Sequence, residues 1–483
     1  MGMRSFTRSV PRWLTQENSA SANWILSSAV WVVLGASMGL VLALEFLLPN
    51  LFQGVPYLTF SRLRQAHVNT VVFGFVSTGM IGLWFYIVPQ LTGRQLWSEF
   101  IGNVAMLAWN GAVGVGVGAI LLGFSQGREY AEFIYGVDVG IMAVLILNAI
   151  NVWATIAQRV EPKMFVSLWY IGATVIVFPI VYFVGNVMWN PPTGALQGIN
   201  DVVFNWFYGH NILGMWLTLG VVPIIYYIIS KVTDTPVYSH VIGLIGFWTI
   251  LLFYNGLGGH HLEWAPIYPY VKNLAIAFSI GMIIPVAAVL VNWLFTLRGN
   301  WGKVFTSIPL ALIVISAIAY ILVSFQGVHM ALRAFNFLEH FGQYVPGHAH
   351  LGILFFSGVG VIGGVYYVLP RICHCELYNW RFAWIQFALL VVGFFFFFFS
   401  FTLTGLEQGS AWFNVGVQVY PNLVGMRPYM GLRPASGALV LANFILYFVI
   451  VFLTWVKHKP MPEPEVPVPL SKPIRTRTTG SKE

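Results

Sequence analysis

Charged residues are scarce in this chain of 483 residues, because Asp, Glu, Lys and Arg together make up only 8% of it. A soluble globular protein carries about 25%, so this chain has too few charges to cover a water-facing surface. Hydrophobic residues make up 58% instead. The composition excludes soluble enzymes and nucleic-acid-binding proteins as interpretations of the whole chain, and it indicates a polytopic membrane protein.

Cysteine is almost absent as well: the two cysteines are Cys373 and Cys375. Two cysteines so close together cannot form a disulfide framework. The chain contains no C-x-x-C-H motif, which excludes a covalently attached c-type haem. Cys373-His374-Cys375 could bind a metal, but we interpret it as a structural or incidental cluster.

Most of the sequence consists of long apolar runs. A helix needs about 20 apolar residues to cross the bilayer, and only helices and closed barrels satisfy their backbone in lipid. The runs are too long for barrel strands, so we predict an all-α bundle of twelve transmembrane helices. The predicted spans are 24–48, 66–93, 99–124, 131–158, 165–189, 203–230, 238–258, 271–297, 304–327, 345–370, 379–405 and 432–456.

The basic residues are distributed unequally between the two sides of these spans. Seventeen of the 24 Lys and Arg residues fall on the side of the termini. The positive-inside rule therefore places both termini in the cytoplasm, and the net charge of +8 indicates contact with anionic membrane lipid rather than nucleic acid. We predict a cytoplasmic segment 1–23, a membrane domain 24–456 and a disordered cytoplasmic tail 457–483.

Six of the eleven histidines lie in or at the edges of predicted spans. An ionisable side chain in a membrane helix is costly and marks a functional site by default. His348 and His350 are two residues apart, so on a helix they project about 200° apart, at about 100° per residue. Each can therefore bind a different metal, which is the arrangement expected of two haems on either side of one helix.

A low-spin haem needs a second axial ligand from another helix, and His67 at the start of the second span is the best remaining candidate. Arg62 and Arg64 lie nearby and could pair with haem propionates, because guanidinium matches carboxylate geometry. They could equally be ordinary interfacial arginines.

Gly258-Gly259-His260-His261 places adjacent histidines at a helix end loosened by glycine. His210 would supply a third nitrogen. Three imidazoles without a carboxylate or thiolate suit copper, with zinc as an alternative. Tyr254 precedes His261 by two helical turns and is expected on the same face, where it could donate an electron and a proton.

These motifs together resemble the catalytic subunit I of haem-copper terminal oxidases, most closely the cbb3-type cytochrome c oxidase. The similarity covers roughly residues 20–456. It is carried by Tyr208-Gly209-His210-Asn211, Tyr226-Tyr227, Pro236-Val237-Tyr238-Ser239, Phe247-Trp248 leading to Tyr254, His260-His261-Leu262, His340, Gly347-His348-Ala349-His350 and Arg128-Glu129-Tyr130-Ala131-Glu132.

The resemblance implies two b-type haems and one copper ion, copper B. It assigns His67 and His350 to the low-spin haem and His348 to the high-spin haem. It also assigns His210, His260 and His261 to copper, makes Tyr254 the active-site tyrosine cross-linked to His210, and suggests that Glu129 or Glu132 binds a calcium ion near the propionates.

The implied activity is reduction of O2 to water with electrons from cytochrome c, coupled to proton uptake and pumping. The location is then the bacterial inner membrane, and the partners are membrane-bound c-type cytochrome subunits. Tyr226, Tyr227, Ser239 and Asn292 are candidate proton-path residues, although each could be a packed polar residue. Two departures concern this path: Gly243 replaces a serine of the family, and Gln343-Tyr344-Val345-Pro346 lacks the usual acid and tryptophan.

Two rival functions remain at this point. A nitric oxide reductase of the same superfamily has an iron centre with a glutamate ligand one turn after its first histidine, where this chain has Gly214. Such reductases also lack the tyrosine. A transporter without a redox centre would also have about twelve spans, and haem absorption bands would exclude it.

Overall fold

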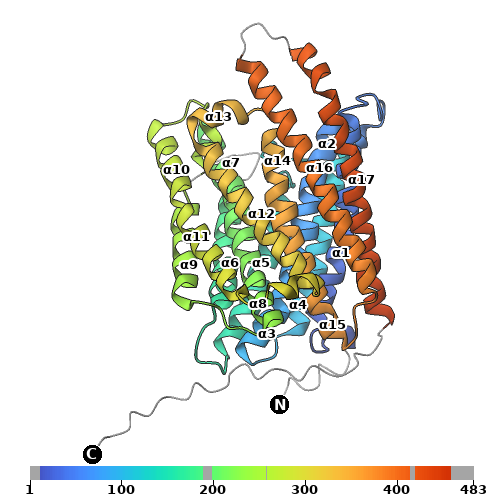
Figure 1. Cartoon of the computed structure of the whole chain (residues 1–483), viewed down its shortest axis with the longest axis vertical. Coiled ribbons are helices and arrows are strands. Elements are labelled where there is room, and N and C mark those ends of the chain that lie inside the picture. The colour runs from blue at the N-terminus through green and yellow to red at the C-terminus, as the bar shows by residue number, and fades with distance from the viewer. Residues whose placement is uncertain (1–10, 189–197, 257, 414–418, 458–483) are drawn as a thin grey trace, which may run out of the picture.

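The computed structural model of the chain describes residues 11–188, 198–256, 258–413 and 419–457 as a bundle of long helices (Figure 1). These residues contain no β-strand. Residues 1–10 of the predicted N-terminal segment and residues 458–483 of the predicted tail lie outside the described residues, so the segment and the tail both remain predictions.

Among the described residues, twelve runs of helix are long and apolar enough to cross a membrane. They coincide one for one with the predicted spans. The spans are α1 (Ser19–Glu45), α2, η4 and α3 (Phe60–Asn69, Thr70–Val76 and Ser77–Thr92), α4 (Glu99–Leu122), α5 (Tyr135–Ala157), α6 and η5 (Val166–Tyr182 and Phe183–Val187), α7, η6 and α8 (Ile199–Asn211, Ile212–Thr218 and Leu219–Thr233), α9 and η7 (His240–Tyr254 and Gly259–Leu262), α10 and α11 (Pro269–Gly281 and Ile283–Leu297), α12 (Ile308–Ala331), α14, η9 and α15 (Tyr344–His350, Leu351–Gly358 and Val359–Cys373), α16 (Trp380–Phe413) and α17 (Val419–Lys457).

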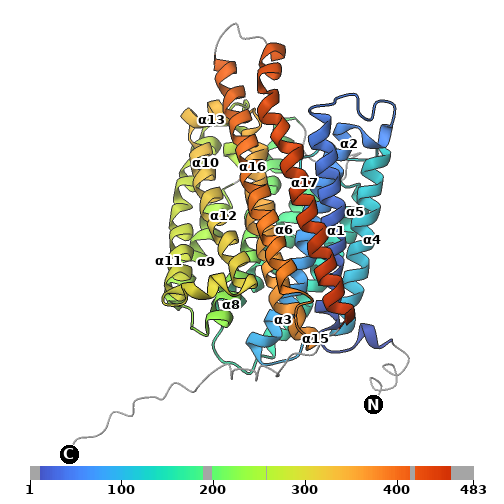
Figure 2. The same ribbon diagram turned by 45° about the vertical axis from the view of Figure 1, so that its right-hand side comes forward.

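In the described part of the chain three short elements connect the spans: the 3₁₀ turns η3 (Pro56–Leu58) and η8 (Trp301–Phe305), and the helix α13 (Arg333–Glu339). The 3₁₀ turn η2 (Arg12–Leu14) precedes α1. The helices α16 and α17 have 34 and 39 residues, well beyond the membrane requirement of about 20. Figure 2 shows that both rise past the rest of the bundle at one end.

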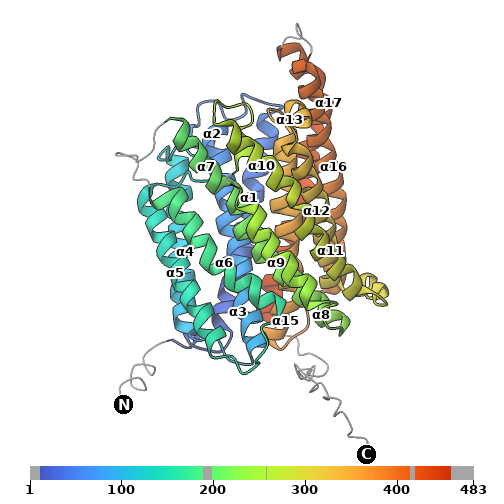
Figure 3. The same ribbon diagram turned by 90° about the vertical axis from the view of Figure 1, so that its left-hand side faces the viewer.

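The helices form an inner and an outer group. The most apolar windows of Phe60–Thr92, Ile199–Thr233 and Tyr344–Cys373 are about nine-tenths buried, whereas those of Pro269–Leu297 and Trp380–Phe413 are mostly exposed. Figure 3 shows α9, α10 and α11 on the outside of the bundle. Large apolar side chains such as Trp248 and Phe395 are exposed, as expected of a surface that faces lipid.

The three inner spans share a local irregularity. Each contains a π-helical turn: η4 follows His67, η6 follows His210 and η9 follows His350 directly. π-helical turns occur frequently at functional sites because they redirect side chains within a helix. These turns were not predicted from the sequence.

Candidate metal centres

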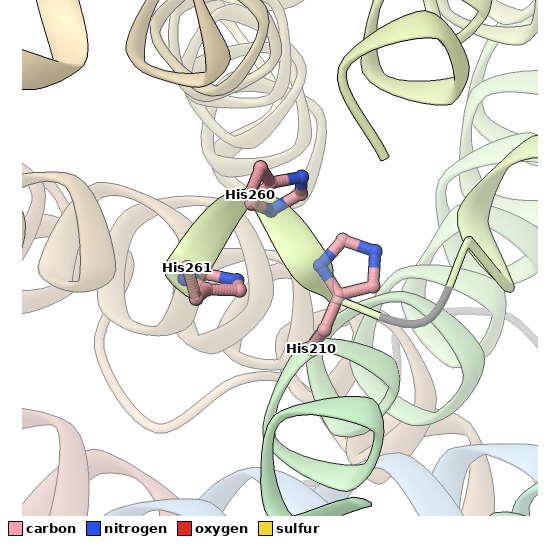
Figure 4. A group of neighbouring side chains, drawn as sticks. All are labelled: His210, His260 and His261. Carbon is pink, nitrogen blue, oxygen red and sulfur yellow. The ribbon is translucent and has the colours of Figure 1, made fainter. Parts of the chain in front are cut away.

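Three histidines from two separate elements meet inside the bundle. His210 lies near the end of α7, and His260 and His261 lie in the 3₁₀ turn η7. One nitrogen from each lies within 4.8 Å of one from each of the others. Figure 4 shows a nitrogen of His210 directed toward the other two rings. A metal–imidazole bond is about 2.0–2.1 Å, so these nitrogens are close enough together to hold one ion.

The remaining nitrogens are held by the protein. His210 Nε2 donates to the backbone carbonyl of Tyr254 at 2.8 Å, and His260 Nδ1 is 2.8 Å from Ser279 Oγ. The His261 ring stacks on Trp206 with centroids 4.4 Å apart. Such partners fix the orientation of ligating imidazoles. Three neutral nitrogens without an acid or thiolate match the donor set expected for copper.

Tyr254 lies against this cluster, but not for the reason predicted. The seven-residue spacing predicted Tyr254 and His261 on one face of a continuous helix. Instead α9 ends at Tyr254, and Gly258 adopts a positive φ of 64° before η7 begins. The tyrosine therefore stacks on His210, with ring centroids 4.3 Å apart and planes 20° apart.

Gly214 makes room for this tyrosine. A Cβ atom at position 214 would lie 2.0 Å from Cδ1 of Tyr254, and its next two neighbours are also atoms of that ring. A side chain at 214 and the tyrosine in its present position therefore exclude each other. This is the position where a reductase-type centre would need its glutamate.

We expect Gly214→Ala to displace Tyr254 and to lower turnover at this centre strongly, while the metal content stays unchanged. Oxygen consumption and metal analysis of the purified complex would test this. Gly114→Ala in α4 is the matched control, because a Cβ atom there meets nothing within 4 Å. Normal turnover in Gly214→Ala would show that the position of the ring is unimportant.

His348 reaches the same centre from the opposite side. It lies in α14, and one cavity is lined by His348, by the three histidines of the cluster and by Tyr254. Gly327, Ala349 and Gly352 also line the cavity, so its walls have small residues where a large planar group would approach the backbone. His348 Nδ1 is 3.3 Å from Gln326 Oε1, which leaves Nε2 for a metal.

Gln326 is a residue that the sequence analysis missed. Its Nε2 donates to Tyr344 Oη at 3.3 Å while its Oε1 faces His348. The amide thereby links His348 to a second helix. A lone glutamine within the apolar run of α12 was the available indication, because an uncharged amide at membrane depth needs partners.

His350 turns away from the cavity and faces His67. The two ring centroids are 6.2 Å apart and the planes differ by 23°. This separation has room for two metal–nitrogen bonds of about 2.0 Å each between the two rings. His67 Nδ1 donates to Gly35 O at 2.8 Å and His350 Nδ1 to Pro346 O at 2.7 Å. Both Nε2 atoms are therefore left for axial ligation.

Residues 20–439 match the protein family described as Cytochrome C and Quinol oxidase polypeptide I. The chain belongs to this family. Cytochrome c oxidase subunit 1 homolog of Agrobacterium tumefaciens is 28% identical over 90% of this chain and 83% of its own length. The cbb3-type cytochrome c oxidase subunit CcoN1 of Stutzerimonas stutzeri is 27% identical over 89% of this chain and 92% of its own.

A solved structure supports the same fold for this oxidase-family chain. The structure of a heme-copper terminal oxidase dimer superposes with a TM-score of 0.76, covering 93% of this chain and 88% of that one at 16% identity. The transporter without a redox centre is excluded by the family, and the family implies haem and copper as cofactors.

Two arginines and two acids were predicted near the oxidase propionates. Arg64 forms an ion pair with Glu129, while Arg62 donates to Leu121 O at 3.2 Å. Glu132 is buried and accepts from Asn69 Nδ2 at 2.9 Å. Burial raises the pKa of Glu132 to about 7, and a cation beside it would favour its ionised form.

The predicted proton-path residues have structural contacts of their own. Ser239 caps α9, since its Oγ accepts from Ile242 N at 3.2 Å. Asn292 accepts from Ser239 N at 2.9 Å and donates to Tyr226 Oη at 3.3 Å. At Gly243 a Cβ atom would lie 2.6 Å from Val166. The space of the family's serine side chain is therefore filled by valine in this oxidase-family chain.

The other predicted segments are in ordinary structural positions. Nζ of Lys231 lies over the ring of Tyr227, 5.7 Å from the ring centroid. Gln343 N donates to Gln408 Oε1 at 2.6 Å, a backbone contact that ties the start of α14 to α16 whatever side chain stands at 343. Cys375 is buried with its thiol 3.6 Å from Thr454 O, which is consistent with a structural cluster.

Proposed function

We infer that this chain is the catalytic subunit of a terminal respiratory oxidase that reduces O2 to water with electrons from cytochrome c. The observation that carries this inference is the shared cavity, in which His348 faces the cluster of His210, His260 and His261 with Tyr254 beside it. A haem held by His348 and a copper ion held by the cluster would supply oxygen binding and electrons there when bound.

We propose that the chain's own residues divide the work between two sites. His67 and His350 would fill both axial positions of a low-spin b-type haem, so that this haem relays electrons and does not bind oxygen. His348 would hold a high-spin b-type haem, which would supply the oxygen-binding iron. His210, His260 and His261 would hold copper, which would supply an electron in the same cavity.

Tyr254 has a distinct role in this proposal. Its ring lies in contact with His210, so the phenol can deliver an electron and a proton to the same cavity. The contact supports a covalent link between the two rings. A reductase reaction would need an acid near His210, and Tyr254 occupies the space that a side chain at position 214 would need.

The remaining parts of the proposal concern the sources of electrons and protons and a bound calcium ion. Without a C-x-x-C-H motif, electrons must arrive through partner subunits, which we propose to be membrane-bound c-type cytochromes. Protons would come from the cytoplasmic side, and pumping would accompany their uptake. One of Glu129 and Glu132 is the proposed ligand of a calcium ion.

We expect the purified complex to contain two b-type haems and one copper per copy of this chain, to consume oxygen and to lack non-haem iron.

We expect His67→Ala to lose the six-coordinate haem spectrum while the high-spin haem remains, because none of the described polar side chains could replace Nε2 at that depth. Reduced-minus-oxidised spectra with separate iron and copper analysis would measure this. Non-haem iron in place of copper would overturn the oxidase assignment, and an unchanged spectrum in His67→Ala would overturn the ligand assignment.

A further inference from the structure

Tyr170 is a buried tyrosine whose hydroxyl has no protein partner. It lies in α6 and is 0% exposed, and its Oη has no hydrogen-bond partner among the residues that the structure describes. Phenylalanine would fill the same space without the hydroxyl, and an unsatisfied polar group in an apolar interior is destabilising. Buried hydroxyls of this kind are usually satisfied by internal water.

The Tyr170 hydroxyl lies against α9, one helical turn further along that helix than Asn292. A Cβ atom at Gly246 would lie 3.1 Å from Tyr170 Oη and 3.2 Å from Val289 Cγ2. One turn earlier in α9, a Cβ atom at Gly243 would lie 3.3 Å from Asn292 Nδ2. Because α9 and α11 pack against each other, Asn292 and Val289 mark two successive levels between them. Tyr170 Oη belongs to the second level.

The next level in the same direction is the cavity of the candidate metal centres. Val286 of α11, one turn beyond Val289, lines this cavity, and so does Tyr254 at the end of α9. The Tyr170 hydroxyl therefore lies between Asn292 and the cavity wall. One helical turn is about 5.4 Å, which a water can bridge with two hydrogen bonds of about 2.8 Å each.

Helix α9 has no polar side chain on its buried face in this interval. Positions 243 and 246 are glycines, and the next buried residues are Phe247 and Ile250. The polar group of the interval comes from α6 instead, as the Tyr170 hydroxyl. Gly246 leaves the space for it, since an added Cβ atom would be only 3.1 Å away.

Two other polar groups lie beside Tyr170 on the side away from the cavity. Tyr226 Oη accepts from Asn292 Nδ2 at 3.3 Å, which leaves its own proton available. The ring centroid of Tyr226 is 6.2 Å from that of Tyr170 and 5.7 Å from that of Trp293. Trp293 Nε1 is also buried without a partner in the described part of the chain. A buried water typically makes about three hydrogen bonds, and these three side chains have that number of free groups.

We propose that Tyr170 is a proton-relay residue, through which protons pass from the level of Asn292 and Tyr226 to the cavity. Tyr170 Oη accepts a proton from a water on the Asn292 side as it releases its own proton to a water on the cavity side. One O–H bond forms and one breaks, so the phenol is neutral before and after the step. Rotation of the hydroxyl then restores the starting state. This inference rests on the proposed function, because reduction of oxygen consumes protons at the cavity.

The first test compares Tyr170→Phe with the wild type in the whole purified complex. The ring and its contact with Phe247 remain, so both haems and the copper should stay bound. We expect oxygen consumption at about a tenth of the wild-type rate, because a positioned proton-transfer group contributes about 10²–10⁴-fold and water would replace part of it. The ratio of the rates in H2O and D2O should rise, because proton transfer then limits turnover.

Tyr366→Phe is the matched control. Tyr366 Oη in α15 is also buried without a partner among the described residues, but its ring lies beside Tyr447 of α17, with centroids 5.7 Å apart. Both its rate and its isotope ratio should match the wild type. If Tyr170 were only a packing residue, Tyr170→Phe would behave like this control, and that result would overturn the proposal.

An experimental structure of the whole complex that shows ordered water is the second measurement, and it does not depend on turnover. We expect a water about 2.5–3.0 Å from Tyr170 Oη, on the side of Tyr226 and Asn292. A hydroxyl without any water would contradict the relay even if the phenylalanine variant were slow. A wild type that binds haem and copper but consumes no oxygen would instead overturn the proposed function.

Discussion

Replacing Tyr254 by phenylalanine should nearly eliminate oxygen consumption while both haems and the copper remain bound. Reduction of O2 to two waters takes four electrons at one place, whereas reduction of nitric oxide takes only two for each pair of molecules. The metals proposed for the cavity supply three electrons, so a fourth must come from an oxidisable side chain in contact with the centre. Tyr254 is that side chain, since its ring stacks on His210.

The phenylalanine variant isolates the hydroxyl from the rest of the ring. It keeps the ring that fills the space beside Gly214, so the packing of α9 against η6 should not change. Oxygen-electrode rates, haem spectra and copper content would be measured together. Tyr320→Phe is the matched control, because Tyr320 also lines the cavity but lies outside the cluster. Full oxygen turnover in Tyr254→Phe would show that the tyrosine is not needed.

Mass spectrometry of the wild type provides a related measurement. A peptide in which His210 and Tyr254 are covalently joined is expected, since their rings are already in contact. The phenylalanine variant should yield the two peptides separately. Two separate peptides in an active wild type would contradict the link without contradicting the electron-donor role.

Much of the fold follows from composition and apolar run length alone. All twelve spans are present, because the bilayer fixes both the length and the apolar character of each helix. The differences lie at helix ends, where polar residues and glycine outweigh hydropathy. Glu99 illustrates this: it begins α4 and accepts backbone N–H groups from Asn18 and Ala20 at 2.8 Å each, which fixes the start of α1 before the predicted boundary.

The site was predictable where it depends on helix periodicity. His348 and His350 indeed lie on different sides of α14, one at the cavity and one facing His67. It was not predictable where the helix is interrupted. The π-helical turns have no sequence signature in a run of apolar residues, and the break after Tyr254 changes its partner from His261 to His210.

The burial of Arg433 is a second feature that could not be predicted from the sequence. An arginine in an apolar run can be taken for an interfacial residue at a helix end, and the predicted span placed it near its start at 432. Only the structure shows that α17 begins at Val419 and that Arg433 is covered on all sides. Its depth depends on the length of the neighbouring helices, which hydropathy does not determine.

Replacing His260 by asparagine should remove copper and abolish oxygen reduction while both haems stay bound. The ligand nitrogens of the three histidines lie within 4.8 Å of one another, so the loss of one leaves two imidazoles, which cannot complete the coordination of the ion. Asparagine preserves polarity near Ser279, which lies 2.8 Å from His260 Nδ1, so the bundle itself should remain folded.

Copper analysis, haem spectra and oxygen consumption would be compared with His240→Asn, an exposed position at the other end of α9. Because His67, His350 and His348 are unaffected, haem bands at wild-type intensity with copper absent would locate the metal at this cluster, and full copper retention would mean that the ion is bound elsewhere.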